Sequence, residues 1–314
     1  MRNILQKTVL VTGAGGFLGS CVVRVLSEHG ASVRALLGPA DINAATLGNL
    51  ATCVIADICD EATIIQHARD VDIVVHMAGP PSVAQSFGQA AEYVRVHAQG
   101  TASVLSAAHL AGVRQFIYIS SAEVYGRPES NPVSESHLVQ ARSPYSAAKI
   151  GAEQLLQSWW HAFGLSTTVL RPFSIYGPGA SPHSLLSSIL RLALNSCPIA
   201  LKDLSPVRDY CFVEDVADAV LKCCLVQRSG FEVLNIGTGT GTSVRALARH
   251  VLTALGCERL PILERGDQRP GATEIGELVA DPSRAEAVIG WRAATSITAG
   301  IRKTVAAAMQ ECGT

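Results

Sequence analysis

The first half of the chain alternates short apolar runs with longer segments whose apolar residues recur at helical spacing. Thr8–Thr12 has the pattern of a strand, and Phe17–His29, after a glycine cluster, has that of a helix leading to a second strand at Ser32–Leu37. Strand, glycine turn, helix and strand in this order are typical of a βαβ unit. The alternation predicts an α/β fold with a doubly wound parallel sheet. Further strands are predicted at Cys53–Ala56, Ile73–His76, Phe116–Ser120 and Thr167–Leu170, and helices at Glu61–Ala68, Ala90–Ala111 and Tyr145–Phe163.

The pattern changes after Arg171-Pro172, where glycine and proline become frequent. We therefore divide the chain into a larger domain over residues 1–171 and a smaller C-terminal lobe that takes most of residues 172–314. Residues 207–230 have the pattern of a strand followed by an apolar helix, and we expect this segment to return to the main sheet. Glu232–Ile236 is expected to belong to the smaller lobe.

Composition and charge exclude several classes of function. The 314 residues include 25 Lys and Arg against 26 Asp and Glu, a net charge of −1, so neither nucleic acid nor an anionic membrane is predicted as a partner. No apolar run reaches the ~18 residues that cross a bilayer. The nine cysteines lack CxxC spacing, which favours reduced thiols in a cytoplasmic protein and no metal site. The pair Cys223-Cys224 is predicted to pack in the core.

The glycine cluster between the first strand and the first helix is a candidate dinucleotide site. Gly13, Gly16 and Gly19 form a GxxGxxG motif in the context that such a site requires. Glycine lets the backbone approach a pyrophosphate, and the helix N-terminus offers free N–H groups and positive potential. The residues predicted to bind the cofactor here are Gly13, Gly15, Gly16, Phe17, Leu18 and Gly19.

The adenosine side of this site is less clearly marked. Asp57, followed by Ile58, ends a predicted strand, and its carboxylate can accept a bond from an adenine amino group or cap a turn. The residue that reads the ribose hydroxyls normally ends the second strand, where Leu37 stands instead of an acid. The choice between NAD and NADP therefore stays open, and Arg34 in the same strand can favour a phosphate.

Tyr145 and Lys149 lie four residues apart, about one helical turn, so their side chains project from one face. A cation held near a phenol favours the phenolate and lowers a tyrosine pKa that is otherwise near 10. The pair is therefore a candidate acid–base device acting on a sugar or alcohol hydroxyl. Ser121, in the polar turn after a predicted strand, is expected to bond the same substrate oxygen.

Four motifs together resemble a known family. They are the glycine motif, the SSAEVYG run at residues 120–126, the Tyr145–Lys149 pair and the run Arg171–Gly179. Through these motifs the chain resembles the extended short-chain dehydrogenase/reductase family over almost its whole length. Within that family it resembles the nucleotide-sugar epimerases and dehydratases. The resemblance implies a dinucleotide-binding Rossmann domain, a substrate-binding C-terminal lobe, NAD as cofactor with NADP not excluded, and a nucleotide-diphosphate sugar as substrate.

The resemblance also implies roles for individual residues. Tyr145 matches the family's catalytic base, Lys149 the lysine that binds the nicotinamide ribose, and Ser121 the catalytic hydroxyl. Further contacts are implied for Ala78 at a strand end beside the cofactor, for Ser174 near the substrate phosphates, and for Arg208 and Arg269 on the diphosphate.

Three positions depart from the family pattern. His97 and Ser174 stand where the family often has Asn, and Leu37 stands where we expect an acid. The asparagine replaced by His97 usually supports the active-site helix, so we expect different hydrogen bonding there. A shorter side chain at position 174 puts one diphosphate contact in doubt.

The leading hypothesis for the reaction is epimerisation through a 4-keto sugar, with Tyr145 as base. Glu123, two residues after Ser121, matches the glutamate of sugar 4,6-dehydratases and uronate decarboxylases, although many epimerase-like sequences also carry it. An NADPH-dependent 4-ketoreductase and a non-catalytic dinucleotide-sensing module remain alternatives. The resemblance also implies a homodimer formed through the helices at Ala90–Ala111 and Tyr145–Phe163.

Overall fold

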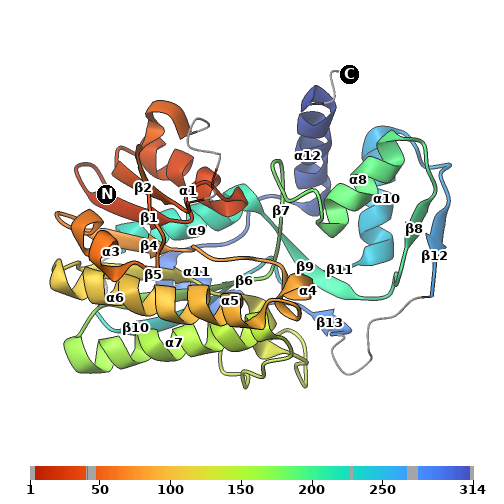
Figure 1. Cartoon of the computed structure of the whole chain (residues 1–314). Helices are drawn as coiled ribbons and strands as arrows, with labels where there is room; N and C mark the ends of the chain where they lie inside the picture. The colour runs from red at the N-terminus through yellow and green to blue at the C-terminus, as the bar shows by residue number, and fades with distance from the viewer. Residues whose placement is uncertain (1–3, 40, 42–46, 227–228, 267–274, 312–314) are drawn as a thin grey trace.

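The computed structural model describes residues 4–39, 41, 47–226, 229–266 and 275–311. Its centre is a seven-stranded sheet in the order β10-β6-β5-β4-β1-β2-β3, and every neighbouring pair is parallel (Figure 1). This confirms the predicted doubly wound Rossmann sheet. Its strands are β1 (Thr8–Thr12), β2 (Ser32–Leu37), β3 (Thr52–Ile55), β4 (Ile73–His76), β5 (Gln115–Ile119), β6 (Thr167–Pro172) and β10 (Phe231–Ile236).

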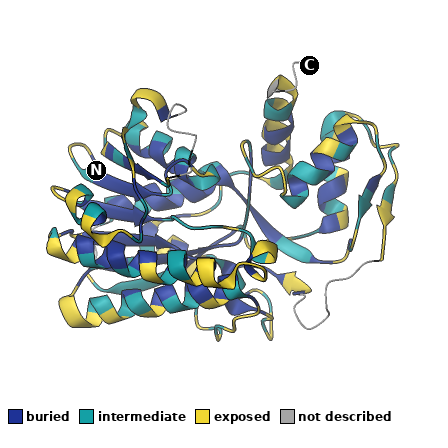
Figure 2. Cartoon of the chain, in the orientation of Figure 1, coloured by how far each residue is buried: buried dark blue, intermediate teal, exposed yellow. Residues whose placement is uncertain are grey.

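Helices cover both faces of this sheet because its strands are apolar on both sides. Val9 and Val11 of β1 belong to one core cluster, whereas Leu10 between them belongs to the other. Successive strand residues point to opposite faces, so a strand buried on both faces needs a continuous apolar run. Figure 2 shows the strands as a buried layer between partly exposed helices. One face carries α1 (Phe17–Glu28) and α9 (Val213–Leu225), and the other α3 (Glu61–His67), α6 (Thr101–Leu110) and α7 (Pro144–Phe163).

The last strand of the main sheet corrects one expectation. Residues 231–236 form β10 and pair with β6, whereas β9 (Val207–Phe212) pairs with β7 (Ser174–Tyr176) in a separate four-stranded sheet. The helix of the predicted return segment packs on the main sheet, where Cys223 and Cys224 lie in the core as predicted, but its strand does not pair with that sheet. A short apolar run fits either sheet equally well, so periodicity alone could not assign these two strands.

The helix predicted over Ala90–Ala111 is also corrected. It consists of α5 (Ala90–Val94), a π-helical segment at Arg95–Gly100, and α6. The Thr101 hydroxyl donates to the carbonyl of His97 at 2.5 Å, a bond four residues back that competes with the regular helical pattern. π-helical insertions are frequent at functional sites.

The smaller lobe has its own apolar core. That core gathers residues of α8 (Leu185–Leu194), α10 (Val244–Leu255) and α12 (Ile297–Glu311) with the inner side of β9. The remaining elements are α4 (Val83–Ser86), α11 (Ser283–Ile289), β8 (Ile199–Leu201), β11 (Gly241–Ser243), β12 (Ile262–Glu264), β13 (Glu277–Leu278) and the short helices η1 (Gly48–Leu50) and η3 (Ala122–Tyr125). Among the described residues, no helix is both long and apolar enough to cross a membrane.

Candidate active site

The glycine loop lies tightly against its neighbours, which is possible because Gly13 and Gly19 carry no side chains. Gly13 has a φ of +68°, and a Cβ there would lie 2.8 Å from the Cα of Ala78 at the end of β4. A Cβ on Gly19 would lie 2.9 Å from the Cα of Ala14. These close approaches bring the loop, the first turn of α1 and the end of β4 together. The predicted contacts Gly13, Gly19 and Ala78 therefore lie in one place.

The start of α1 faces the same loop. Gly16 is the N-cap residue in an extended conformation, Phe17 and Leu18 form the first turn, and no acidic residue lies in that turn. The first amides of a helix have no acceptor within the helix, and the helix dipole adds positive potential. The loop and the helix terminus therefore fit the pyrophosphate of a nicotinamide dinucleotide.

Asp57 follows β3 and is fixed by two donors. Its carboxylate accepts from the backbone N–H of Cys59 at 2.9 Å and from the Arg95 guanidinium at 3.0 Å. The Cys59 N–H, followed by Arg95, holds the pKa of Asp57 below its ordinary value. Ile58 beside it is buried, and its side chain packs where a Cβ of Gly100 would stand. The predicted adenine contact of Asp57 stays a prediction.

Sequence reasoning missed one acidic residue near the glycine loop. A Cβ on Gly15 would lie only 2.6 Å from the carboxyl carbon of Asp41, so this carboxylate lies against the loop. The Asp41 N–H donates to the carbonyl of Gly38 at 2.9 Å, which turns the chain back after β2. The Gly38-Pro39 pair was the available signal, because such dipeptides mark turns.

Tyr145 and Lys149 lie in the first turns of α7. The side chain of Ser143 caps the helix by accepting from the Ser146 N–H, and Pro144 is at the first position. Tyr145 is 8% exposed and Lys149 4%. The Lys149 ammonium donates to the carbonyl of Ile119 at 2.7 Å and lies 6.0 Å from the centre of the Tyr145 ring. The structure thus places both side chains at the end of β5.

The pKa of Tyr145 moves against the expectation from sequence. Burial raises it to about 12, the Glu123 carboxylate also raises it, and a hydrogen bond with the Ser121 hydroxyl lowers it. Burial lowers the pKa of Lys149 to about 7, against the opposing influence of Glu153. In the chain by itself the Tyr145 pKa is therefore raised, where the sequence predicts a lowered one, because removal from water favours the neutral form of both groups.

Ser121 and Glu123 approach Tyr145 from the turn after β5. Ser121 is the N-cap of η3, and its hydroxyl accepts from the Glu123 N–H at 3.2 Å. Both residues influence the Tyr145 phenol, so the three lie close together. The structure thus brings the four predicted catalytic side chains, those of Ser121, Glu123, Tyr145 and Lys149, together at the end of β5.

His97 shows what replaces the family's asparagine. Its Nε2 lies 3.1 Å from the carbonyl oxygen of Pro80, so Nε2 carries the proton and donates. Burial, together with the Lys149 ammonium, lowers the pKa of His97 to about 3, and the ring stays neutral. Its ring centre lies 5.5 Å from that of Tyr145 in an edge-on arrangement. Within the described residues Nδ1 is buried without a hydrogen-bond partner.

A buried polar network supports α7 from behind. Glu153 accepts from Arg171 through two bonds of 3.0 and 2.6 Å, and from the hydroxyl of Ser120 at 2.5 Å. Arg171 also donates to the hydroxyl of Tyr125, which donates to the Asn235 side chain at 2.7 Å. The network ties α7 to β5, β6 and β10, so it fixes the helix that carries Tyr145 and Lys149.

Two of the predicted substrate contacts lie in the smaller lobe. Ser174 of β7 pairs with Tyr210 of β9, and Arg208 lies two residues before Tyr210. Side chains two apart on a strand share a face, so Ser174 and Arg208 lie on the same face of the small sheet. The Arg208 guanidinium donates to the carbonyl of Val207 at 2.9 Å. Arg269 lies outside the described residues.

A cavity of about 340 Å³ lies between α10 and α12, away from the catalytic side chains. It is lined by Arg249, His250 and Arg302 among others. None of the predicted site residues lines it, so it does not define the active site.

Comparison with known proteins agrees with this geometry. Residues 9–237 match the family described as NAD dependent epimerase/dehydratase. The chain is 34% identical over 312 residues to a UDP-glucose 4-epimerase of Mycolicibacterium smegmatis, covering 94% of this chain and 96% of that protein. It is 30% identical to a dTDP-D-glucose 4,6-dehydratase of Bos taurus, covering 95% and 88%. The UDP-glucose 4-epimerase of Thermotoga maritima, solved with UDP-glucose, superposes with a TM-score of 0.90 at 28% identity, covering 97% and 99%.

Proposed function

Because the chain belongs to the NAD dependent epimerase/dehydratase family, we propose that it is a nucleotide-sugar 4-epimerase that works through a transient 4-keto sugar. Membership of this family confirms the resemblance inferred from the motifs and NAD as the cofactor. The observation that carries the proposed reaction is the group of Ser121, Tyr145 and Lys149 at the end of β5, two strands away in the sheet from β1 and the glycine loop that follows it.

The reaction needs a base at the sugar hydroxyl and an acceptor for the hydrogen on the same carbon. Bound NAD supplies the hydride chemistry. Tyr145 accepts the hydroxyl proton, and Ser121 bonds the same sugar oxygen and holds it near the phenol. Since burial raises the Tyr145 pKa to about 12, positive charge must approach the phenol before it acts as a base. Lys149, 6.0 Å from the ring centre, supplies that charge when it is protonated.

The smaller lobe holds the rest of the substrate. Arg208 binds the diphosphate of a nucleotide-diphosphate sugar, and Ser174 on the same face contributes a shorter polar contact. Arg269 is proposed for the same diphosphate from its sequence match alone. The division into a dinucleotide-binding domain at 1–171 and a mainly substrate-binding remainder stays a proposal.

A 4,6-dehydratase is the second candidate, and Glu123 is the observation that favours it. Glu123 follows Ser121 by two residues in the turn after β5, and its carboxylate raises the pKa of Tyr145, so its charge acts on the same site. Once the ketone forms, the neighbouring carbon becomes acidic and Glu123 can remove its proton. The similarity to a dTDP-D-glucose 4,6-dehydratase supports this alternative.

We also propose that two chains associate through α6 and α7, which lie side by side in Figure 1. Leu110 is 65% exposed and Phe163 52% exposed on these helices, and apolar side chains of this size at an open surface favour association. Light scattering of the purified protein measures this directly. The cytoplasmic location stays a prediction. The eight described cysteines are free thiols, which a reducing compartment favours.

The decisive experiment incubates the purified protein with UDP-glucose and, separately, with dTDP-glucose, without added reductant. An epimerase produces the 4-epimer, seen by proton NMR, whereas a dehydratase produces a 4-keto-6-deoxy sugar. Tyr145→Phe should lower turnover by about 10²- to 10⁴-fold while melting like the wild type. Tyr176→Phe is the matched control, because Tyr176 is buried in the core of the smaller lobe. Full activity of Tyr145→Phe would refute the mechanism.

A further inference from the structure

Asp41 places a carboxylate on the glycine loop from an unexpected position. The carboxyl carbon occupies space 2.6 Å from where a Cβ of Gly15 would stand, so the side chain lies directly over the loop backbone. The bond from the Asp41 N–H to the Gly38 carbonyl, 2.9 Å, closes a turn just after β2 and returns the chain to the loop. An anionic side chain here faces the site that we assign to the cofactor.

The residue at the end of the second strand, which normally binds the ribose hydroxyls through a carboxylate, cannot do so in this chain. Leu37 ends β2, is 0% exposed and packs in the core with α1 and α9. In residues 38–47, which connect β2 to the next described helix, Asp41 is the only acidic residue in the sequence. A residue that binds the ribose hydroxyls needs a hydrogen-bond acceptor beside the loop that binds the pyrophosphate. The carboxylate of Asp41 is such an acceptor.

Arg34 does not give the site a preference for the 2′-phosphate of NADP. Its guanidinium donates to the carbonyls of His67 at 2.6 Å and Arg69 at 2.8 Å, at the C-terminal end of α3. Cations bind favourably at helix C-termini, so this arginine has a structural role there. The sequence-based suggestion that Arg34 favours a phosphate therefore loses its support.

We propose that Asp41 accepts hydrogen bonds from the adenosine ribose hydroxyls of NAD and excludes NADP by repelling the 2′-phosphate. The inference rests on the NAD-dependent function proposed above and adds its cofactor selectivity. It assigns the role of the missing acid at Leu37 to a residue four positions further along the chain.

Binding of nucleotide, measured without turnover, tests this directly. Protein stripped of nucleotide is titrated with NAD, NADP and ADP-ribose by calorimetry, for the wild type, Asp41→Asn and Asp41→Ser. The wild type should bind NAD at least about tenfold more tightly than NADP, because hydrogen bonds to a charged acceptor are lost and like charges meet. Both variants should bind NAD and ADP-ribose about tenfold or more weakly, and NADP no more weakly than the wild type. Glu258→Gln, which removes an exposed carboxylate from the smaller lobe, should change neither affinity.

The other binding outcomes overturn the proposal, and a separate activity measurement distinguishes it from the proposed function. Equal affinity of the wild type for NAD and NADP, or unchanged NAD binding in Asp41→Asn, means that Asp41 does not read the ribose. Tighter NAD binding in Asp41→Asn means that the carboxylate competes with the pyrophosphate for the loop. A wild type that binds neither nucleotide refutes this inference and the proposed function together. Selective NAD binding that depends on Asp41, with no turnover of any nucleotide sugar, upholds the inference while refuting the function.

Discussion

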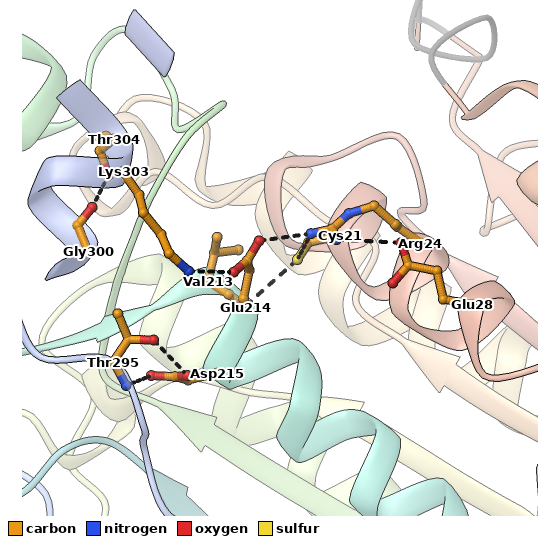
Figure 3. A network of polar contacts seen from close by, with 10 residues as sticks. All are labelled: Cys21, Arg24, Glu28, Val213, Glu214, Asp215, Thr295, Gly300, Lys303 and Thr304. Carbon is orange, nitrogen blue, oxygen red and sulfur yellow. Dashed lines mark hydrogen bonds and ion pairs between the residues drawn. The ribbon is translucent and has the colours of Figure 1, made fainter. Parts of the chain in front are cut away.

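Two polar networks in this molecule use similar bonds in opposite surroundings. Behind α7, Arg171 and Glu153 meet at 2.6 Å with side chains only 7% and 5% exposed. Between the domain and the lobe, Glu214 at the start of α9 meets Arg24 of α1 at 3.1 Å and Lys303 of α12 at 3.2 Å (Figure 3). These three side chains are 41 to 56% exposed.

The buried network of Arg171 and Glu153 is costly to break, whereas the exposed network around Glu214 is easy to open. A buried ion pair whose partner is removed leaves an uncompensated charge in a medium of low dielectric constant, whereas water screens an exposed pair. The helix that carries Tyr145 and Lys149 is thus fixed to β5 and β6 through Ser120, Glu153 and Arg171. The lobe that carries Arg208 is joined near α9 by contacts that cost little to open.

Removal of the Glu153 side chain should have the largest effect on the free energy of unfolding. Glu153→Ala leaves the Arg171 guanidinium buried and unpaired, so we expect the free energy of unfolding to fall by about 3 to 5 kcal/mol in urea titrations. Glu214→Ala, the matched change in the exposed network, should cost less than about 1 kcal/mol. The double variant Glu153→Met with Arg171→Met should recover much of the loss. Equal losses in the two single variants would contradict the comparison.

A smaller effect is expected from the charge of Lys149. Its folded pKa is about 7, below the ordinary 10.5, so between these values the unfolded chain binds more protons than the folded one. Stability from this group therefore rises with pH through that window, by roughly 1 to 2 kcal/mol between about pH 7 and pH 8.5. Lys149→Met should remove this part of the slope in urea titrations at the two pH values. Lys303→Met, at an exposed site, should keep the wild-type slope; a wild-type slope in Lys149→Met would show that Lys149 titrates elsewhere.

The smallest effect concerns the network of Figure 3. Lys303→Ala removes one exposed partner of Glu214 and should lower the free energy of unfolding by about 0.2 to 1 kcal/mol. That loss should shrink between about 0.1 M and about 1 M NaCl, because the Debye length falls from about 10 Å to about 3 Å. The loss caused by Glu153→Ala should persist at both salt concentrations. A loss in Lys303→Ala that is independent of salt would show that Lys303 acts through packing, for example on the Phe212 ring 5.0 Å away.

Local signals predicted the features that depend on neighbours in sequence. The glycine loop, the bounds of β2 and β4, and the common face of Tyr145 and Lys149 follow from turn chemistry and helical spacing. Signals that depend on distant partners were misread or missed. Periodicity assigned the strand β9 to the main sheet, where β10 is found instead. It also predicted one continuous helix where the structure has a π-helical segment that carries His97.

The order of strands and helices and the identities of the reactive groups were determined by the sequence, since both depend on short-range stereochemistry and on side-chain type. Only the tertiary structure decided the protonation preferences of Tyr145 and Lys149, because removal from water depends on everything packed around them. It also decided that the carboxylate on the glycine loop belongs to Asp41, because a turn in the chain, and not the end of a strand, brings it there.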